Sequence, residues 1–361
     1  MKPLNIARAG GGTGGHVFPI KSLIQHLQTR ADLQAKVAQM FRFGTAQSLE
    51  QETCFELQKT IKNLTFLSIF SGKFRREKSF SALLKNGRDL LLFLLGTLQS
   101  LFLLKKYEID VVFCKGGYVA LPVVIAAKLL GKKIIVHESD VHPGLVNRIA
   151  GKVAHKNFSG FPKVLPHTEV IGQLLSEDLL TELPASQEQK KQTQVLVMGG
   201  SQGSKDLYQA LAQLLDEEEQ FQTMHFTILL GKLNQELAQL FIPFPQVKTI
   251  DFATQKEIGQ LYAQSDVAIT RAGTTSLAEQ ELFDLKLLMI PIPRTHDQLE
   301  NAKRYVQHKN GILIQQNAPD FLPKLKNELL QLKDFKKTPR KRDRASEIHK
   351  AKDLILEQMI A

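Results

Sequence analysis

Cysteine is scarce in this chain, because only Cys54 and Cys114 occur among 361 residues. Two cysteines cannot build the disulfide framework of a small secreted domain, and their spacing fits no zinc site. The N-terminus also lacks the basic, apolar and small-residue order of a signal peptide, since glycines interrupt it at once. These absences predict a protein of the reducing cytoplasm.

Long hydrophobic runs are missing as well. The most apolar stretch, Leu90–Leu104, contains Gly96, Gln99 and Ser100 and is shorter than the roughly 20 residues that span a bilayer. We therefore expect a buried or half-buried helix there, not a transmembrane one.

Acidic residues are in the minority, with 36 Asp and Glu against 47 Lys and Arg, for a formal net charge of +11. A basic chain favours anionic partners, such as a nucleotide, a phospholipid surface or a nucleic acid. The hydrophobic content of 43% is ordinary for a globular protein, and the length predicts about two domains.

The segment Gly10–His16 reads GGGTGGH and follows a predicted strand, Leu4–Ala9. The apolar spacing after it predicts a helix, with Pro19 expected in the first turn. A strand-to-helix turn of glycines aims backbone N–H groups and a helix N-terminus at one point, which suits a phosphate. His16 adds a side chain that titrates near neutral pH. A purely structural tight turn remains the alternative.

The first half of the chain alternates predicted strands and helices, which indicates a doubly wound parallel sheet. In such sheets ligands bind at the carboxyl ends of the strands. Five residues at predicted strand ends should therefore converge on one edge: His16, Gly116, Gly117, Glu138 and Asp140. The expected strands are Lys36–Phe43, Leu64–Phe70, Ile109–Cys114 and Lys132–His137, and the expected helices are Ala120–Leu130 and Val146–Ala154.

Residues 72–89 place basic side chains among apolar ones, directly before the leucine-rich stretch. They are either a solvated helix face beside the core or a patch that lies on an anionic membrane. The pattern alone does not separate the two interpretations.

Prolines at 162 and 166 and a loss of periodicity predict a domain junction at Phe161–Thr168. The pattern then restarts with a strand at Gln194–Met198, a third glycine turn at Gly199–Ser204 and a helix at Asp206–Leu215. Two Rossmann-like lobes that face a cleft would explain this repeated strand–turn–helix pattern.

The second lobe continues with further alternating elements. Its basic segment Lys333–Arg344 and a last helix, Glu347–Ile360, are interpreted as a surface closing the fold rather than a nucleic-acid arm. The expected strands are Met224–Leu230, Val247–Phe252, Val267–Thr270 and Leu287–Pro291, with helices at Gln255–Gln264, through Glu279 and from Gln298.

Hydroxyl residues Thr274, Thr275 and Ser276 follow Gly273 and precede Glu279 by a helical turn. A helix N-terminus with hydroxyls could hold a diphosphate, and a carboxylate there could accept hydrogen bonds from a ribose diol. Gln298 and Asn301 could bind sugar hydroxyls. The alternative is helix capping, with Glu279 completing a capping box on Ser276.

In combination and order, these motifs resemble the MurG-type glycosyltransferases of peptidoglycan synthesis. The resemblance covers nearly the whole chain. It is carried by Gly10–His16, Gly116-Gly117-Tyr118, His137-Glu138 with Gly144-Leu145 and Asn147, Gly199–Gly203, Arg271-Ala272-Gly273 through Glu279, and Gln298 with Asn301-Ala302.

The resemblance implies the GT-B glycosyltransferase fold, an α/β fold of two Rossmann-like lobes facing a cleft, with domains 1–161 and 162–344 and a last helix, about 345–361, that returns to the first. It implies inverting transfer of GlcNAc from UDP-GlcNAc to the 4-hydroxyl of undecaprenyl-diphospho-MurNAc-peptide (lipid I), giving lipid II. The implied place is the cytoplasmic face of the inner membrane, as a peripheral protein on an anionic surface. No cofactor, no nucleic acid and, without an Asp-x-Asp motif, no bound metal are expected.

Residue roles follow from the same resemblance. His16 is the implied general base. The implied UDP-GlcNAc-binding residues are Thr13, Gly14, Gly15, Asp140, Ser176, Ser201, Ala253, Thr274, Thr275, Ser276, Leu277, Ala278, Glu279 for the ribose and Gln298 for the GlcNAc hydroxyls. The implied acceptor side comprises Gly116, Gly117, Tyr118, Glu138 and Asn147.

This chain departs from the family pattern at three places. Asp140 stands where the family has an amide, and Ser176 stands where it has a phosphate-binding arginine. The usual Asp-His-Gln order is here His296-Asp297-Gln298. A non-catalytic nucleotide-sugar-binding relative is therefore one alternative.

An NAD(P)-dependent oxidoreductase is the other alternative. Gly10, Gly12 and Gly15 fit the G-x-G-x-x-G pattern, and Arg42 could meet a 2′-phosphate. Against it, no acidic residue ends the second strand, and a nucleotide-type turn recurs in the second lobe.

Overall fold

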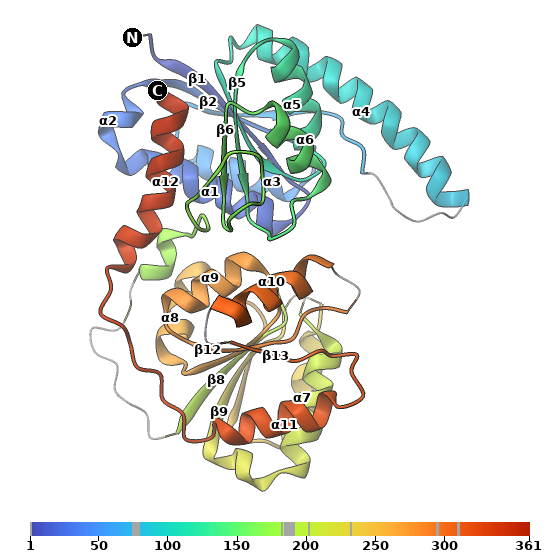
Figure 1. Ribbon diagram of the computed structural model, residues 1–361, viewed down its shortest axis with the longest axis vertical. Coiled ribbons are helices and arrows are strands. Elements are labelled where there is room, and N and C mark those ends of the chain that lie inside the picture. Colours follow the sequence, from blue (N-terminus) through green and yellow to red (C-terminus); the bar gives the residue numbers. More distant parts are fainter. Residues whose placement is uncertain are drawn as a thin grey trace. The chain divides into compact units, whose positions relative to one another are not determined.

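The computed structural model describes residues 2–73, 80–181, 183, 192–200, 203–231, 233–293, 296–308 and 311–361, with the backbone alone at 80–83, 296 and 308. The chain forms two compact units (Figure 1). Unit 1 comprises Met1–Ser176 with Ser346–Ala361, and unit 2 comprises Glu177–Ala345.

Unit 1 contains a seven-stranded parallel sheet in the order β3-β2-β1-β4-β5-β6-β7. Its strands are β1 (Leu4–Gly10), β2 (Val37–Gly44), β3 (Leu64–Ser68), β4 (Val111–Gly116), β5 (Lys133–Glu138), β6 (Lys156–Ser159) and β7 (Thr168–Val170). Its helices are α1 (Gly14–Thr29), α2 (Ala31–Gln34), α3 (Leu49–Gln58), α4 (Phe80–Lys106), α5 (Ala120–Leu129), α6 (Leu145–Val153) and α12 (Arg344–Ile360).

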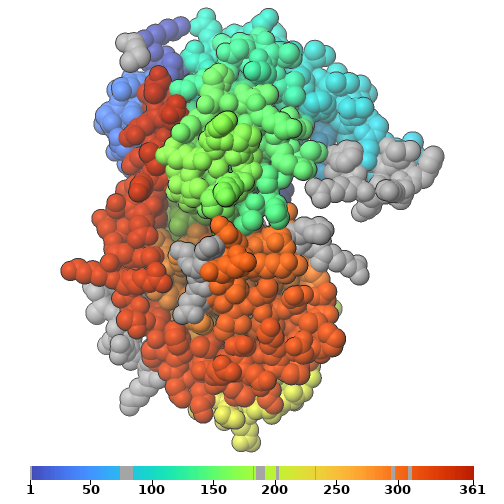
Figure 2. All heavy atoms as spheres, in the orientation of Figure 1, coloured from blue at the N-terminus to red at the C-terminus, as the bar shows by residue number. Residues whose placement is uncertain are grey.

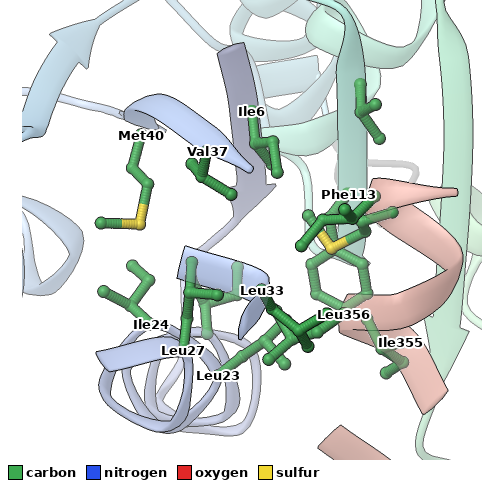
Figure 3. Packing of buried hydrophobic residues seen from close by; sticks show 14 of the residues in the cluster. Ile6, Leu23, Ile24, Leu27, Leu33, Val37, Met40, Phe113, Ile355 and Leu356 are labelled. Carbon is green, nitrogen blue, oxygen red and sulfur yellow. The ribbon is translucent and has the colours of Figure 1, made fainter. Parts of the chain in front are cut away.

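Both faces of this sheet are apolar, because helices cover both. Side chains alternate along β1, so Ile6 packs under α1 while Ala7 and Ala9 pack under α5. Figure 3 shows the first of these cores, in which Leu23 of α1 and Phe113 of β4 lie near Ile6. Such continuously apolar strands are typical of parallel sheets.

Helix α12 completes the core of unit 1 from the far end of the chain. Ile355 and Leu356 are fully buried in the cluster under α1 (Figure 3), and Figure 2 shows α12 lying on the surface of this unit. On its flank, Asp353 pairs with Arg30 and, at 2.8 Å, with the His26 Nε2. The buried Lys352 Nζ lies 3.4 Å from the Ser22 Oγ.

Unit 2 contains a six-stranded sheet, also parallel, in the order β10-β9-β8-β11-β12-β13. Its strands are β8 (Thr193–Met198), β9 (Met224–Leu229), β10 (Val247–Ile250), β11 (Val267–Thr270), β12 (Lys286–Met289) and β13 (Gly311–Leu313). Its helices are α7 (Lys205–Glu217), α8 (Gln255–Gln264), α9 (Thr274–Leu282), α10 (His296–His308) and α11 (Phe321–Gln331), with short 3-10 helices at Glu177–Leu180, Glu219–Thr223 and Gln235–Phe241.

The domain boundary expected at 161/162 is wrong. Thr168–Val170 forms the edge strand β7 and pairs in parallel with β6, so the structural boundary falls between Ser176 and Glu177. A three-residue strand is too short to show a hydrophobic period, and the prolines beside it resemble a linker.

Two further local expectations were wrong. Helix α1 begins at Gly14, so Pro19 lies inside the helix and not in its first turn. Because proline has no N–H, the Gly15 carbonyl lacks its usual helical partner. In addition, the apolar helix is not shorter than a membrane span, because Leu84–Lys106 is by length and composition sufficient to cross a membrane. The expectation of a half-buried helix that does not cross the membrane stays a prediction.

We predict that Leu356→Ala lowers the stability of unit 1 by about 2–5 kcal/mol, because it opens a cavity in a fully buried cluster. Hydrogen exchange of the β1 and β4 amides should accelerate accordingly, while the β8 and β11 amides keep their protection. Lys350→Ala, an exposed change on the same helix, is the control. Unchanged exchange in β1 would contradict the role given to α12.

Candidate active site

The β1–α1 turn and the β4–α5 turn are packed backbone against backbone. The Gly11 N–H donates to the Gly116 carbonyl at 3.2 Å, and a Cβ on Gly117 would lie 2.0 Å from the Gly11 carbonyl oxygen. Gly12 has φ +88°, and a Cβ there would lie 2.6 Å from the Tyr118 ring. The expected convergence of these two turns is therefore present, and glycine is required by contact.

A buried carboxylate supports the first turn from below. Glu50 of α3 accepts the Gly12 N–H, and a Cβ on Gly11 would lie 2.0 Å from its Oε1. Glu50 is 2% exposed, so its carboxyl group is buried under the Gly10–His16 loop. Sequence reasoning missed it, because α3 was not predicted.

His16 lies in the first turn of α1, and Thr13 is the N-cap residue of that helix. The Thr13 Oγ1 lies 2.9 Å from the His16 Nδ1, so this side chain orients the ring and does not cap the helix. Burial, followed by the positive charges of Lys115 and Arg42, lowers the pKa of His16 to about 4. The imidazole is consequently neutral at pH 7 and can accept a proton.

Three buried cations lie on the sheet face under α1. Arg8 and Arg42 are cross-strand neighbours, and Lys115 lies beside Gly10, where a Cβ would approach its own Cβ to 2.9 Å. Burial lowers the pKa of Arg8 to about 9 and that of Arg42 to about 10. The Lys115 Nζ donates to the Ser139 Oγ at 2.6 Å, and burial lowers its pKa as well.

Within the part of the chain that the structure describes, the guanidinium nitrogens of Arg8 have no hydrogen-bond partner. Arg42, by contrast, donates to the carbonyls of Phe43 at 2.8 Å, Arg8 at 3.3 Å and Gly10. The expected availability of Arg42 for a 2′-phosphate is therefore wrong, since its donors hold the end of β1. A buried cluster of cations beside a ligand-type loop is a feature of functional sites.

The predicted acceptor residues Glu138 and Asn147 are joined to each other. Asn147 donates to Glu138 at 2.9 Å, and the Glu138 carboxylate also accepts the N–H groups of Ser139, Asp140 and Gly144. Burial raises the pKa of Glu138. Both side chains are nearly fully buried, so they shape the loop after β5. Their contact with an acceptor stays a prediction.

The remaining predicted residues of unit 1 lie at two places. Asp140 is half-buried in the loop after β5, where its charge acts on Lys115. Ser176 is half-buried at the end of unit 1. Gly14 and Gly15 lie in the first turn of α1, and their contact with the donor stays a prediction.

In unit 2, helix α9 begins without a side-chain cap. Its N-cap residue is Gly273, and Thr274, Thr275 and Ser276 lie inside the first turn. The capping box expected as an alternative is wrong, because the Ser276 hydroxyl is past the cap and Glu279 is engaged elsewhere. First-turn N–H groups without a capping side chain are suited to an anion.

Glu279 is 6% exposed and accepts a hydrogen bond from the Tyr262 hydroxyl at 3.1 Å. Burial raises the pKa of this carboxyl to about 7. On the same helix, Leu277 is buried and Ala278 is half-buried, and neither has a polar side chain, so their predicted donor contact would be made by the backbone or by packing.

Several other predicted polar residues hold loops. Arg271 donates to the Ile290 carbonyl and to the Gln316 Oε1, each at 2.7 Å, and also to Ser204. Asn301 is buried, and its Nδ2 lies 3.4 Å from the Ala272 carbonyl, so its side chain holds the loop after β11, and its sugar contact stays a prediction.

Three donor-site expectations remain. The Gln298 Oε1 accepts the Ile292 N–H at 2.9 Å, which positions its amide near the loop before α10. Ala253 is buried in the turn before α8. Ser201 lies outside the described residues.

Solved structures show where this fold occurs. Acinetobacter baumannii MurG matches with a TM-score of 0.71 and 22% identity over 99% of each chain. A UDP-GlcNAc 2-epimerase from Neisseria meningitidis, bound to UDP-GlcNAc, matches with a TM-score of 0.64 and 13% identity over 100% of each chain. The chain has the two-domain α/β fold of GT-B glycosyltransferases.

The sequence matches the glycosyltransferase family 28 N-terminal domain over residues 6–159 and the C-terminal domain of that family over residues 194–358. The chain therefore belongs to glycosyltransferase family 28.

Two curated relatives carry the name UDP-N-acetylglucosamine--N-acetylmuramyl-(pentapeptide) pyrophosphoryl-undecaprenol N-acetylglucosamine transferase. The one from Staphylococcus carnosus (strain TM300) is 32% identical over 316 residues, which cover 83% of this chain and 81% of the relative. The one from Staphylococcus aureus (strain bovine RF122 / ET3-1) is 34% identical, covering 83% of each.

Replacing Lys115 by Met should raise the pKa of His16 from about 4 by about one unit, because a like charge that disfavours the imidazolium is removed. Burial remains, so the pKa should stay below 6.5. The measurement is an NMR titration of the His16 ring, assigned with His16→Gln. Lys128→Met, on the exposed side of α5, is the control. An unmoved pKa would show that Lys115 does not act on the ring.

Proposed function

We propose that this chain transfers GlcNAc from UDP-GlcNAc to the 4-hydroxyl of MurNAc in a polyprenyl-diphosphate-linked muramoyl peptide. The observation that carries the proposal is the α9 N-terminus, where the N-cap residue Gly273 has no capping side chain and the hydroxyl residues of the first turn precede the buried Glu279. Membership of family 28 and relatives named for this reaction support the same assignment.

Unit 2 supplies donor binding in this proposal. The first turn of α9 holds the diphosphate through backbone N–H groups and the hydroxyls of Thr274–Ser276. Glu279 accepts hydrogen bonds from the ribose diol, and Gln298 binds the GlcNAc hydroxyls. As the bond from the anomeric carbon to the diphosphate breaks, the helix N-terminus stabilises the charge that develops on UDP.

Unit 1 supplies the base. The acceptor 4-hydroxyl attacks the anomeric carbon of the α-linked sugar, and the new bond forms with inversion to a β-1,4 linkage. The proton of the hydroxyl passes to the His16 imidazole, which is neutral because its pKa is about 4. A low pKa weakens a base, so the proton transfer depends on the acceptor hydroxyl becoming acidic as its bond to carbon forms.

His16→Ala should lower turnover by about 10²–10⁴-fold without unfolding the chain, because general-base catalysis contributes that much. The assay is transfer of labelled GlcNAc onto a lipid I analogue, with circular dichroism to check the fold. His225→Ala, an exposed histidine on β9, should keep full activity. Wild-type turnover in His16→Ala would refute the base. No transfer by the wild-type chain that binds UDP would identify a non-catalytic relative.

Helix α4 carries the proposed contact with the membrane. Gly96, Ser100 and Leu104 face inward, and a Cβ on Gly96 would lie 2.0 Å from the Phe70 carbonyl oxygen. The opposite face is apolar and solvent-exposed, and Figure 2 shows this helix at the surface of unit 1. The exposed residues of that face are Leu84, Leu90, Leu91, Leu94, Leu95, Leu98 and Phe102.

Basic side chains lie at both ends of this apolar face, namely Lys85 and Arg88 at one end and Lys105 and Lys106 at the other. An amphipathic helix with such flanks binds in the interface of an anionic leaflet. We therefore infer a peripheral position on the cytoplasmic face of the plasma membrane, where a prenyl-linked acceptor is accessible. Of the earlier basic segment, residues 74–79 lie outside the described residues.

The double variant Leu94→Asp/Leu98→Asp should weaken binding to phosphatidylglycerol-containing vesicles by at least about tenfold, because two exposed leucines can no longer enter the interface. Vesicle co-sedimentation at several salt concentrations measures this. Ile242→Asp, an exposed apolar residue of unit 2, is the control. If the double variant binds vesicles as tightly as the wild type, α4 is not the docking surface.

A further inference from the structure

The carboxylate of Glu279 is held by one neighbour in the described residues. The Tyr262 hydroxyl on α8 donates to the Glu279 Oε2 at 3.1 Å, and Tyr262 is fully buried. Burial and this hydroxyl are the two influences on the pKa of Glu279: burial raises it and the hydroxyl lowers it. The tyrosine therefore favours the ionised carboxylate in a place that otherwise disfavours it.

Tyr262 is itself fixed from two sides. Its ring packs against Phe283 at the end of α9, with centroids 5.6 Å apart. Its backbone carbonyl and that of Ala263 accept hydrogen bonds from the Lys337 Nζ at 2.7 and 2.8 Å. Lys337 is 8% exposed, and Arg344 stacks over Phe283 at 5.0 Å.

The basic segment Lys333–Arg344 thus packs against the ends of α8 and α9. Lys336 pairs with Asp266 at 3.2 Å, and Arg340 pairs with Asp284 at 3.3 Å. The segment therefore contacts both the helix that carries Tyr262 and the end of the helix that carries Glu279.

We propose that Tyr262 is a positioning residue for the ribose of the donor. Its hydroxyl donates a hydrogen bond to the Glu279 Oε2 and stops the carboxylate from rotating. The Oε1 is then left to accept hydrogen bonds from the ribose diol. This inference rests on the proposed role of Glu279 and goes beyond it. Tyr262 touches no reacting atom and acts through the carboxylate alone.

A pH dependence follows from the same contact. Only the ionised carboxylate accepts both diol hydroxyls, so UDP affinity should rise as pH increases through about 7, the pKa of Glu279. Without the Tyr262 hydroxyl the pKa of the carboxyl moves higher, and the affinity midpoint moves to higher pH. The cation on the α8 side, Lys337, faces the backbone of Tyr262 and not Glu279.

The test is calorimetric titration of the full chain with UDP at several pH values between 6 and 9. Tyr262→Phe should weaken UDP binding about tenfold at pH 7, the typical effect of losing a hydrogen bond to a charged group, and shift the midpoint upward. Glu279→Asp, which withdraws the carboxylate from the hydroxyl, should act similarly. Tyr305→Phe, a buried tyrosine of α10, is the matched control and should bind UDP like the wild type.

Two further measurements separate the inference from the proposed function. In a Glu279→Gln background, adding Tyr262→Phe should cause no further loss of UDP affinity, whereas a merely structural tyrosine would add its own effect. The wild type should prefer UDP over 2′-deoxyuridine diphosphate, and Tyr262→Phe should reduce that preference.

The outcomes are distinct. If the wild type binds both nucleotides alike, Glu279 does not contact the diol and the ribose assignment fails. If the wild type discriminates and Tyr262→Phe retains the same preference and the same pH midpoint, the positioning role of Tyr262 is overturned.

Discussion

The contact between two glycine turns is the constraint on which the candidate site of unit 1 depends. Because Gly11 and Gly117 lie backbone to backbone, β1 and β4 end at one point and α1 starts in a fixed direction. Glu50 then fixes the turn from below, and Thr13 orients His16 above it. Any side chain in this contact would separate the turns and displace the imidazole.

In each unit, burial disfavours the charged form of one titratable side chain. In unit 1, desolvation and then the positive charges of Lys115 and Arg42 keep His16 neutral. In unit 2, desolvation pulls the carboxyl of Glu279 toward neutrality, and the Tyr262 hydroxyl partly restores its charge. Among the described residues the buried guanidinium of Arg8 has no hydrogen-bond partner, which costs free energy because its donors have lost water. The positive charge of the neighbouring Arg42 adds to burial in lowering the pKa of Arg8.

The sequence was sufficient for the architecture, because parallel strands and glycine turns leave local signals. Strand ends at Gly10, Gly116 and Glu138 follow from apolar runs that stop at small or polar residues. Contacts between distant segments leave no such signal. Glu50 reaches Gly12 from an unpredicted helix, and Tyr262 reads as an ordinary core residue in the pattern of α8. β7 was missed because three residues show no period.

Helix α12 has a consequence for how the chain is made. Unit 2 is one continuous segment, whereas the core of unit 1 is incomplete until residues 346–361 have been synthesised. During synthesis, unit 2 is complete before unit 1, and the part of the cluster under α1 that Ile355 and Leu356 fill stays open until α12 leaves the ribosome. Chaperones that bind nascent hydrophobic surface would meet this protein at the site that α12 later covers.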